Sequence, residues 1–307
     1  TIYGTQAKLQ ADKIKLSETN LIVENNKLER NVRAIYLELW FTKNKSNLIS
    51  SLEKEYENFA LIAEKKYALG ETNLIEKIAA EGKNEAIRLL KSEVELDIKS
   101  LTKQLQLLMN MDVSFEISNK NLEKIPFKTF TEENTENPIL LLQQNEMAIK
   151  EREYKLENAK FLPDLSAGYF NQQIDGVKNF SGFEVGLKIP LFFRSQQGKS
   201  QAAKKSAEIA SINYQQTKLE LDAIVQTKLN EYEKQKAALA YYDSTGILLA
   251  DKLFSSAIKA YKEGEIGYVE YIALMEQSIE IRSSYLNALN LHNQTVNEIN
   301  YLTGKYN

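Results

Sequence analysis

The chain has 307 residues, 26% charged and 43% hydrophobic, and its 39 basic residues against 42 acidic ones give a net charge of −3. This composition is too apolar for a disordered chain, and there is no run of about 18 apolar residues that would form a transmembrane helix. The near balance of charge excludes nucleic acid as an expected partner. The absence of cysteine excludes disulfides and thiolate metal sites.

The first 69 residues are expected to form one very long helix or a nearly continuous stack of helices. Residues 5–69 contain no glycine or proline, and apolar residues recur among them at helical spacing. At about 1.5 Å per residue such a helix would reach on the order of 100 Å, far beyond the breadth of a compact domain. Gly70 supplies the left-handed residue that ends a helix, and a second helix is expected over residues 74–109, with Gly82 tolerated inside it.

Residues 112–137 lose the helical periodicity and are interpreted as a connector. A helix is expected to resume over residues 138–161, because Pro138 suits the first turn of a helix.

A β-hairpin is expected over residues 163–191. In its second half, apolar residues alternate strictly with Glu184, Gly186 and Lys188, which is the pattern of a strand with one apolar face. Each strand would have about nine to ten residues, the length that a tilted strand needs to cross a bilayer core. The residues predicted to face lipid are Phe183, Val185, Leu187 and Ile189.

A long helical hairpin is expected over residues 195–304, and its turn repeats an earlier one. The segment around Tyr67 returns about 194 positions later around Tyr261, so that residues 65–79 align with residues 259–273. The register continues beyond the turn, which indicates that a whole helix-turn-helix has been duplicated. Such a repeat favours a scaffold or conduit over an enzyme.

The duplication predicts two structural repeats. Residues 1–111 would be the long helical hairpin of the first repeat, residues 112–137 an equatorial connector, and residues 138–307 the second repeat. The first residues match those that follow the hairpin of the second repeat when small register shifts are allowed. The expectation is therefore that the first repeat lacks its own first helix and β-hairpin here.

Four marks in this order resemble the TolC-like outer-membrane efflux protein family, over essentially the whole chain. They are residues 162–165 entering a strand, residues 186–192 leaving one, the paired Tyr-x-x-Gly-Glu turns, and residues 301–304. The resemblance implies a mainly α fold: very long antiparallel helices form coiled-coil helical hairpins in two structural repeats, and one β-hairpin joins a membrane barrel. Residues 70–74, 168–172 and 264–268 look most like channel modules paired with, or fused to, CusA/CzcA-type heavy-metal RND pumps.

The resemblance implies a homotrimer that forms a passive exit duct, with its barrel in outer-membrane lipid and its helical tunnel in the periplasm. Its partners would be a periplasmic adaptor, also called a membrane fusion protein, and an inner-membrane RND pump that drives the transport of substrates such as heavy-metal cations. The chain would need no cofactor and do no bond chemistry.

Two sets of residues at the duplicated turns are candidate sites. The turns would be periplasmic tips that dock the adaptor, through Tyr67, Gly70, Glu71, Tyr261, Gly264 and Glu265. An acidic ring that favours cations at the tunnel mouth would consist of Glu71, Glu76, Glu265 and Glu270. The plainer interpretations are that glycine ends a helix and that glutamates are favoured at a helix start.

His292 is the only histidine, so one chain cannot assemble a histidine-based metal cluster or a catalytic triad, and a packing or surface role is expected. The four methionines are expected to fill gaps in the core rather than relay copper. The alternative function is a non-membrane coiled-coil scaffold or periplasmic adaptor. The hairpin distinguishes the two, because a channel requires its apolar face to point outward instead of packing under helices of the same chain.

Overall fold

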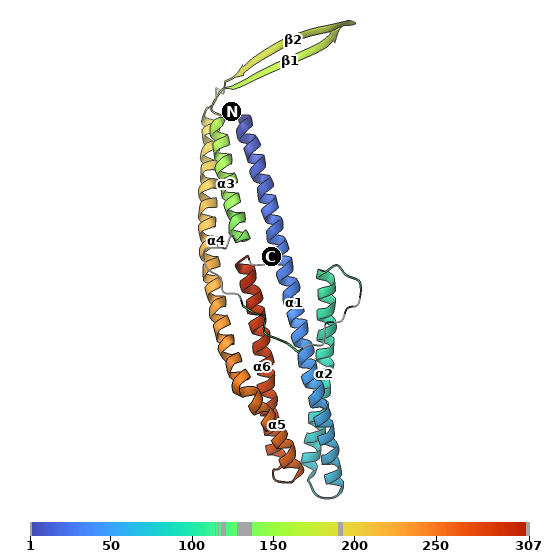
Figure 1. Cartoon of the computed structure of the whole chain (residues 1–307). Helices are drawn as coiled ribbons and strands as arrows, with labels where there is room; N and C mark the ends of the chain where they lie inside the picture. Colours follow the sequence, from blue (N-terminus) through green and yellow to red (C-terminus); the bar gives the residue numbers. More distant parts are fainter. Residues whose placement is uncertain are drawn as a thin grey trace. The chain divides into compact units, whose positions relative to one another are not determined.

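The computed structural model describes residues 2–113, 115, 117, 121–127, 137–189 and 193–304. Its elements are α1 (Ile2–Ala68), α2 (Leu74–Leu108), α3 (Pro138–Ala159), β1 (Asp164–Ile174), β2 (Val177–Lys188), α4 (Phe193–Tyr241), the π-helical turn η2 (Tyr242–Gly246), α5 (Ile247–Lys262) and α6 (Tyr268–Leu302) (Figure 1). The expected fold class, mainly α with very long helices and one β-hairpin, is confirmed for these residues. None of the described helices is long and apolar enough to cross a membrane.

The π turn η2 interrupts a stretch that the sequence pattern predicts as continuous α-helix. Gly246 is buried at its end, and a Cβ atom there would lie 2.8 Å from Cδ1 of Tyr242 and 3.2 Å from Cε1 of Tyr241. A larger residue would force the two tyrosine rings to move. The turn therefore depends on a close approach that helical periodicity does not report.

The chain divides into two compact units. Unit 1 consists of residues 1–26 and 134–224, and unit 2 consists of residues 27–133 and 225–307. The two longest helices, α1 and α4, contribute residues to both. These units are defined by contacts in space, whereas the two expected repeats are defined by sequence similarity. The division into repeats therefore stays a prediction.

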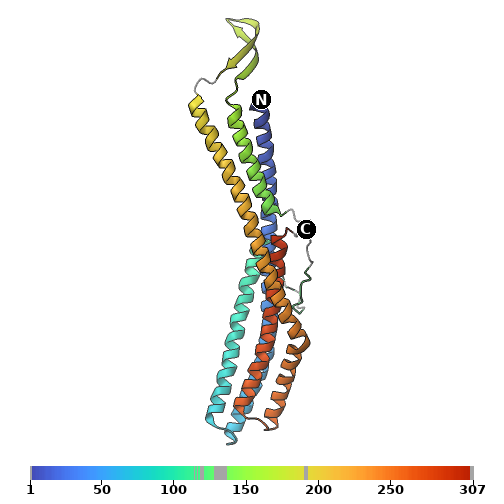
Figure 2. The ribbon, with the colours of Figure 1, turned by 90° about the vertical axis from the view of Figure 1, so that its left-hand side faces the viewer.

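In unit 1 α3 lies between the beginning of α1 and the beginning of α4 (Figures 1 and 2). Its core includes Leu9, Ile149 and Leu156. The buried amide of Asn145 donates to Thr19 Oγ1 at 2.9 Å, and Arg152 forms an ion pair with Asp12. The pair of Asn145 and Thr19 favours one register of the two helices, since the buried Asn145 amide would be costly without its acceptor.

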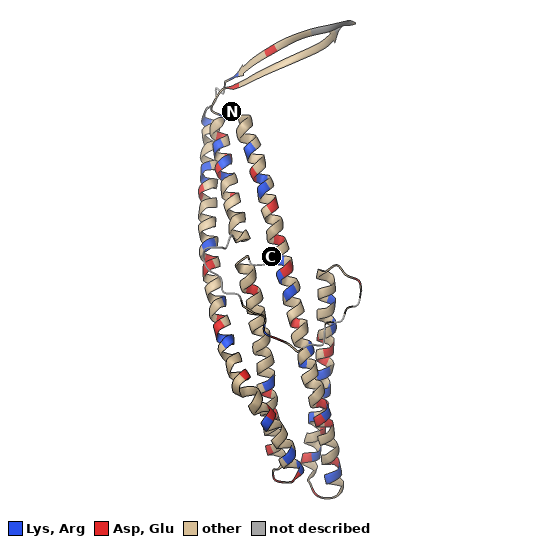
Figure 3. Cartoon of the chain, viewed as in Figure 1, with Lys and Arg blue, Asp and Glu red and all other residues tan. Residues whose placement is uncertain are grey.

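In unit 2 the rest of α1 packs with α2, α5 and α6, and α6 has buried residues from Tyr271 to Leu302. The largest core cluster lies where the two helical hairpins turn, and it consists of Leu52, Tyr56, Phe59, Ala63, Ala80, Ala257, Tyr261, Tyr271, Ile272 and Met275. Further along α6, side-chain amides donate to backbone carbonyls of α1, from Gln294 to Ala34 at 3.0 Å and from Asn297 to Arg30 at 3.1 Å. Positive and negative side chains are interspersed along the helices (Figure 3).

Candidate functional site

The first candidate surface is one face of the β-hairpin. The antiparallel register pairs Leu165 with Leu187, Ala167 with Val185, and Tyr169 with Phe183. Because side chains alternate across a strand, these six residues share one face. The Tyr169 and Phe183 rings contact each other, with centroids 5.3 Å apart.

The four residues predicted to face lipid are all exposed. The exposed fractions are 85% for Phe183, 76% for Val185, 61% for Leu187 and 54% for Ile189. Ile189 lies just after the end of β2. No described helix covers this face, so the arrangement that would contradict a channel is not found among the described residues. A contiguous exposed apolar face of this kind marks an interaction with lipid or with another chain.

The second candidate surface consists of the two duplicated turns. Gly70 and Gly264 have positive φ values of 75° and 76°. At the first turn Gly70 N–H donates to Tyr67 O and Glu71 N–H donates to Lys66 O, and the second turn repeats this from Gly264 to Tyr261 O and from Glu265 to Ala260 O. Both are Schellman motifs, in which a left-handed glycine closes the helix.

Asn110 closes α2 with the same two hydrogen bonds, from Asn110 N–H to Leu107 O and from Met111 N–H to Gln106 O, and the glycine bond of the closure recurs at the end of α6. Gly304 has a φ of 68°, and its N–H donates to the carbonyl of Tyr301 at 3.1 Å.

The two equivalent tyrosines of the turns have different surroundings. Tyr67 is 40% exposed, and Lys77 Nζ lies 5.5 Å from its ring centroid. Tyr261 is only 4% exposed and its hydroxyl donates to Glu76 Oε1 at 2.6 Å. The Tyr261 ring also packs on Phe59 and Tyr271, with centroids 5.3 Å and 4.7 Å away. The two tyrosines are therefore equivalent in the sequence repeat but not in their packing.

Electrostatics at the turns follow from this packing. Burial, and then the hydrogen bond to the Glu76 carboxylate, raise the pKa of Tyr261. Burial raises the pKa of Tyr271 to about 12. Glu76 also accepts a hydrogen bond from the Thr72 hydroxyl at 2.5 Å, so both of its carboxylate oxygens are engaged. Glu71, Glu265 and Glu270 are exposed, and the acidic ring stays a prediction.

Sequence reasoning missed the contact between Glu76 and Tyr261. The spacing from Asn73 to Glu76 indicates only a helix cap, and Asn73 Oδ1 does accept from the Glu76 N–H at 2.9 Å. The bond to Tyr261 joins residues 185 positions apart and belongs to tertiary packing. A local pattern does not carry that information.

His292 and Met275 occupy packing positions, but the prediction that all four methionines fill gaps in the core is wrong for Met109 and Met111, which lie exposed at the end of α2. His292 is 5% exposed and Met275 is fully buried, whereas Met109 and Met111 are 37% and 39% exposed. Within the described part of the chain no group of three or more His, Asp or Glu side chains could hold a metal ion.

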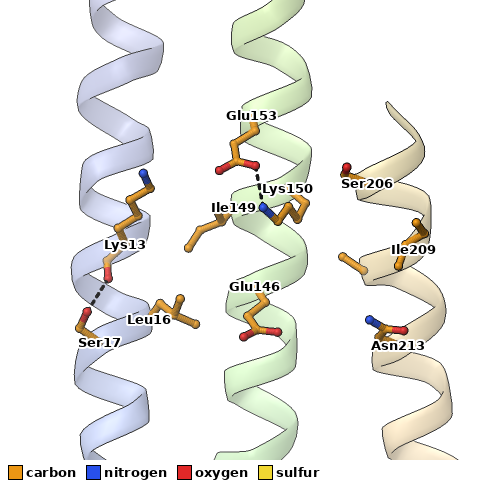
Figure 4. Close-up of a pocket in the computed structure, with 11 residues that line it drawn as sticks. Lys13, Leu16, Ser17, Glu146, Ile149, Lys150, Glu153, Ser206, Ile209 and Asn213 are labelled. Atoms are coloured by element: carbon orange, nitrogen blue, oxygen red, sulfur yellow. Dashed lines mark hydrogen bonds and ion pairs between the residues drawn. The ribbon is translucent and has the colours of Figure 1, made fainter. Parts of the chain in front are cut away.

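Unit 1 contains a groove of about 690 Å³ between α1, α3 and α4 (Figure 4). Leu16, Ile149 and Ile209 provide apolar surface, while Lys150 pairs with Glu153 at 2.9 Å. The two serine hydroxyls that line the groove donate to backbone carbonyls rather than to a base, from Ser17 to Lys13 O and from Ser206 to Ala202 O, both at 3.1 Å. The groove is a space between packed helices rather than a catalytic pocket.

No family model matches the sequence, and no curated protein sequence matches it. Solved structures do. The Campylobacter jejuni CmeC outer membrane channel matches with a TM-score of 0.88 at 15% identity, over 99% of this chain and 68% of that one. The outer-membrane channel OprN matches with a TM-score of 0.89 at 13% identity, over 99% and 72%. A structure of CusC, from work on the conformational changes that accompany its folding and transmembrane channel formation, matches with a TM-score of 0.86 at 13% identity. The match covers 98% of this chain and 74% of CusC.

These likenesses define the class of fold: the long-helix fold of outer-membrane channels, with its helical hairpins and a β-hairpin. The chain has the TolC-like fold, and the resemblance found in its sequence is confirmed for the fold.

Proposed function

We propose that the chain is the channel component of a tripartite efflux system, located in the outer membrane with its helical tunnel in the periplasm. It is a passive exit duct and does no bond chemistry. The observation that carries this proposal is the exposed apolar face of the hairpin. A scaffold that never meets lipid has no use for such a face, since exposed apolar surface of this kind promotes aggregation.

The hairpin also requires other chains. Each of its two strands pairs with the other only, so among the described strands each has one unpaired edge. Unpaired backbone groups are costly in lipid, and closure with further strands satisfies them. A homotrimer, in which each copy contributes strands to one barrel, meets this requirement.

Helix α2 provides a surface for a second copy of the chain. One side of α2 is packed, with Ala80, Val94 and Leu105 buried. At about 100° per residue the opposite side carries a second apolar stripe, which is exposed. This α2 stripe consists of Ile75, Ile78, Leu89, Leu96 and Leu107. A helix with apolar stripes on two opposite sides fits a position between two neighbours.

Replacing both Leu89 and Leu96 by glutamine is expected to lower the fraction of trimer. Each leucine withdrawn from an interface costs about 1.5–3 kcal/mol, and glutamine keeps the helix propensity. The measurement is sedimentation of the purified chain in detergent. The matched control replaces Glu95 and Lys99, two exposed residues beside the α2 stripe, by glutamine. Equal trimer fractions for the two double variants would rule out this interface.

The adaptor and the RND pump are proposed partners at the turns. The exposed surface of each turn combines an apolar residue with a glutamate: Leu69 with Glu71 at the first turn, and Val269 with Glu265 at the second. An adaptor with a helical hairpin could pack on the apolar residues while its basic residues meet the glutamates. Heavy-metal cations are the proposed substrate class, and the likeness of residues 70–74, 168–172 and 264–268 to metal-pump channel modules supports them.

Gly264→Val is expected to weaken adaptor binding and efflux while the helices still form. Valine is strained at a positive φ, whereas asparagine tolerates it, so Gly264→Asn is the control at the same position. The measurement is metal tolerance of cells that carry each variant with the adaptor and the pump. Tolerance unchanged by valine would count against docking at the turns. Tolerance lost equally with asparagine would show that the turn conformation is not what the adaptor requires.

A further inference from the structure

Part of the connector lies as an extended strap along α6 in unit 2. This connector strap is residues 121–127. Asn293 of α6 binds two of its peptide groups, since Asn293 Nδ2 donates to Glu123 O at 2.8 Å and Asn293 Oδ1 accepts from Ile125 N at 2.8 Å. On the α1 side, Asn44 Oδ1 accepts from Leu122 N at 3.2 Å. One amide side chain thus pairs with alternate groups of an extended backbone, as a neighbouring strand would.

Aromatic and apolar contacts hold the same strap. The Leu122 side chain is buried with Leu239, Ala288 and Leu289. The Phe127 ring packs on Tyr232, with centroids 4.5 Å apart. The strap therefore has an apolar anchor on each side of its paired peptide groups.

His292, beside Asn293, makes a further hydrogen bond to the strap. Its Nε2 lies 3.2 Å from Ile125 O. A carbonyl oxygen only accepts, so Nε2 must carry the proton, and in the neutral ring Nδ1 then holds a lone pair. Nδ1 is buried, and among the described residues it has no hydrogen-bond partner.

A second proton on this ring would go to Nδ1, where the described residues offer it no acceptor. A buried donor without a partner is costly, and a buried charge more so. The charged and titratable groups nearby do not favour a cation. The strap presents Lys124, and α4 presents Tyr232 and Lys236 around the same 220 Å³ cavity. On the far side of Ile125, α1 presents Arg33.

The nearby carboxylates are already paired. Lys124 forms an ion pair with Asp243 of η2, and Lys236 pairs with Glu233 at 3.1 Å. Those carboxylates neutralise the lysines rather than the histidine. Burial is the main cause that lowers the pKa of His292, and Lys124 lowers it further, against the Ile125 hydrogen bond.

We propose that His292 and Asn293 form a proton-sensitive clamp on the connector strap, which holds the strap while the ring is neutral and releases it when the ring is protonated. The inference is independent of the channel role, because it rests on contacts within unit 2 alone.

The direction of the pH dependence follows from linkage. The closed clamp lowers the pKa of His292 below the ordinary value, so the open form binds more protons in mildly acidic solution. The closed form is then fully favoured above the ordinary pKa of histidine and loses stability as the pH falls below it. Each pKa unit of difference between the open and closed forms raises the opening constant up to about tenfold.

The test uses the full chain in detergent, without a histidine tag. Because His292 is the only histidine, its ring gives a single set of NMR signals that needs no assignment. The expected result is a neutral ring protonated at Nε2, with a titration midpoint below that of a free histidine. A midpoint at or above the ordinary value, or a ring protonated at Nδ1, would overturn the proposal.

Hydrogen exchange of the strap amides provides the second readout, measured at about pH 7.5 and about pH 5 and corrected for intrinsic exchange. Protection in the wild type is expected to fall at the lower pH. His292→Gln keeps an N–H donor for Ile125 O but does not titrate, so its protection should be the same at both values. Asn293→Ala should lose protection at both. A wild type without pH dependence, or a His292→Gln variant that retains it, would contradict the clamp. Should His292→Gln fail to fold, the NMR titration of the wild type decides alone.

Discussion

Ala167→Arg is expected to keep the chain out of the outer membrane, whereas Ser166→Arg is expected to leave it there. Ala167 pairs with Val185 on the apolar face of the hairpin, and Ser166 pairs with Gly186 on the other face. An arginine that points into lipid costs up to about 2–4 kcal/mol, most at the middle of the bilayer and less toward its surfaces. An arginine on the opposite face points away from the lipid and avoids most of that cost.

The two variants differ by one position in the strand, and both replace a small exposed residue by arginine. The measurement is the distribution of the chain between outer-membrane and soluble fractions, together with its partitioning into lipid vesicles. Equal loss from the membrane for both variants would mean that the apolar face of the hairpin is not the one that contacts lipid in preference to the other face. Equal retention would mean that the hairpin does not meet the bilayer, which would favour the scaffold interpretation.

Tyr261→Ala is expected to destabilise the chain far more than Tyr67→Ala, although the two tyrosines are equivalent in the repeat. Tyr261 is buried against Phe59 and Tyr271, and truncating such a ring costs about 3–5 kcal/mol. The loss also leaves Glu76 without its tyrosine partner. Tyr67 is 40% exposed with one cation contact at its ring, so its truncation should cost below about 1 kcal/mol.

The measurement is the urea midpoint of unfolding of the detergent-solubilised chain, followed by circular dichroism of the helices. Similar shifts for the two variants would contradict the asymmetry of the turns. A large shift for Tyr67→Ala alone would mean that Tyr67, and not Tyr261, is the ring held by the core.

The elements that were predictable are those that local chemistry decides. The lack of glycine and proline over residues 5–69 predicts a helix that the structure has at Ile2–Ala68. Strict alternation predicts the hairpin, and the left-handed residues Gly70 and Gly264 predict where helices end. Each of these signals is a property of the continuous segment that forms the element, and packing with distant residues does not override it.

The features that were not predictable depend on residues distant in sequence. The π turn requires Gly246 to pass close to two tyrosine rings, and the pattern of apolar residues contains no sign of it. The connector residues 121–127 show no periodicity, yet Asn293 binds them by both atoms of its amide. His292 was expected to have a packing or surface role, and its burial is ordinary; only the structure shows that one of its nitrogens holds the strap.

The left-handed glycine at the end of α6, Gly304, limits how specifically a partner can recognise the duplicated turns by their backbone. Tyr-x-x-Gly occurs at Tyr67, Tyr261 and Tyr301, and in all three it gives the same hydrogen bond and a left-handed glycine. Asn110 closes α2 with a left-handed residue in the same way, so a partner that recognised this backbone shape alone would find at least four such positions on each chain. Glutamate follows the glycine at Glu71 and Glu265, whereas lysine follows Gly304. The sign of that one charge distinguishes a turn between helices from the end of α6, and exchanging it would be the smallest change that redirects such a partner.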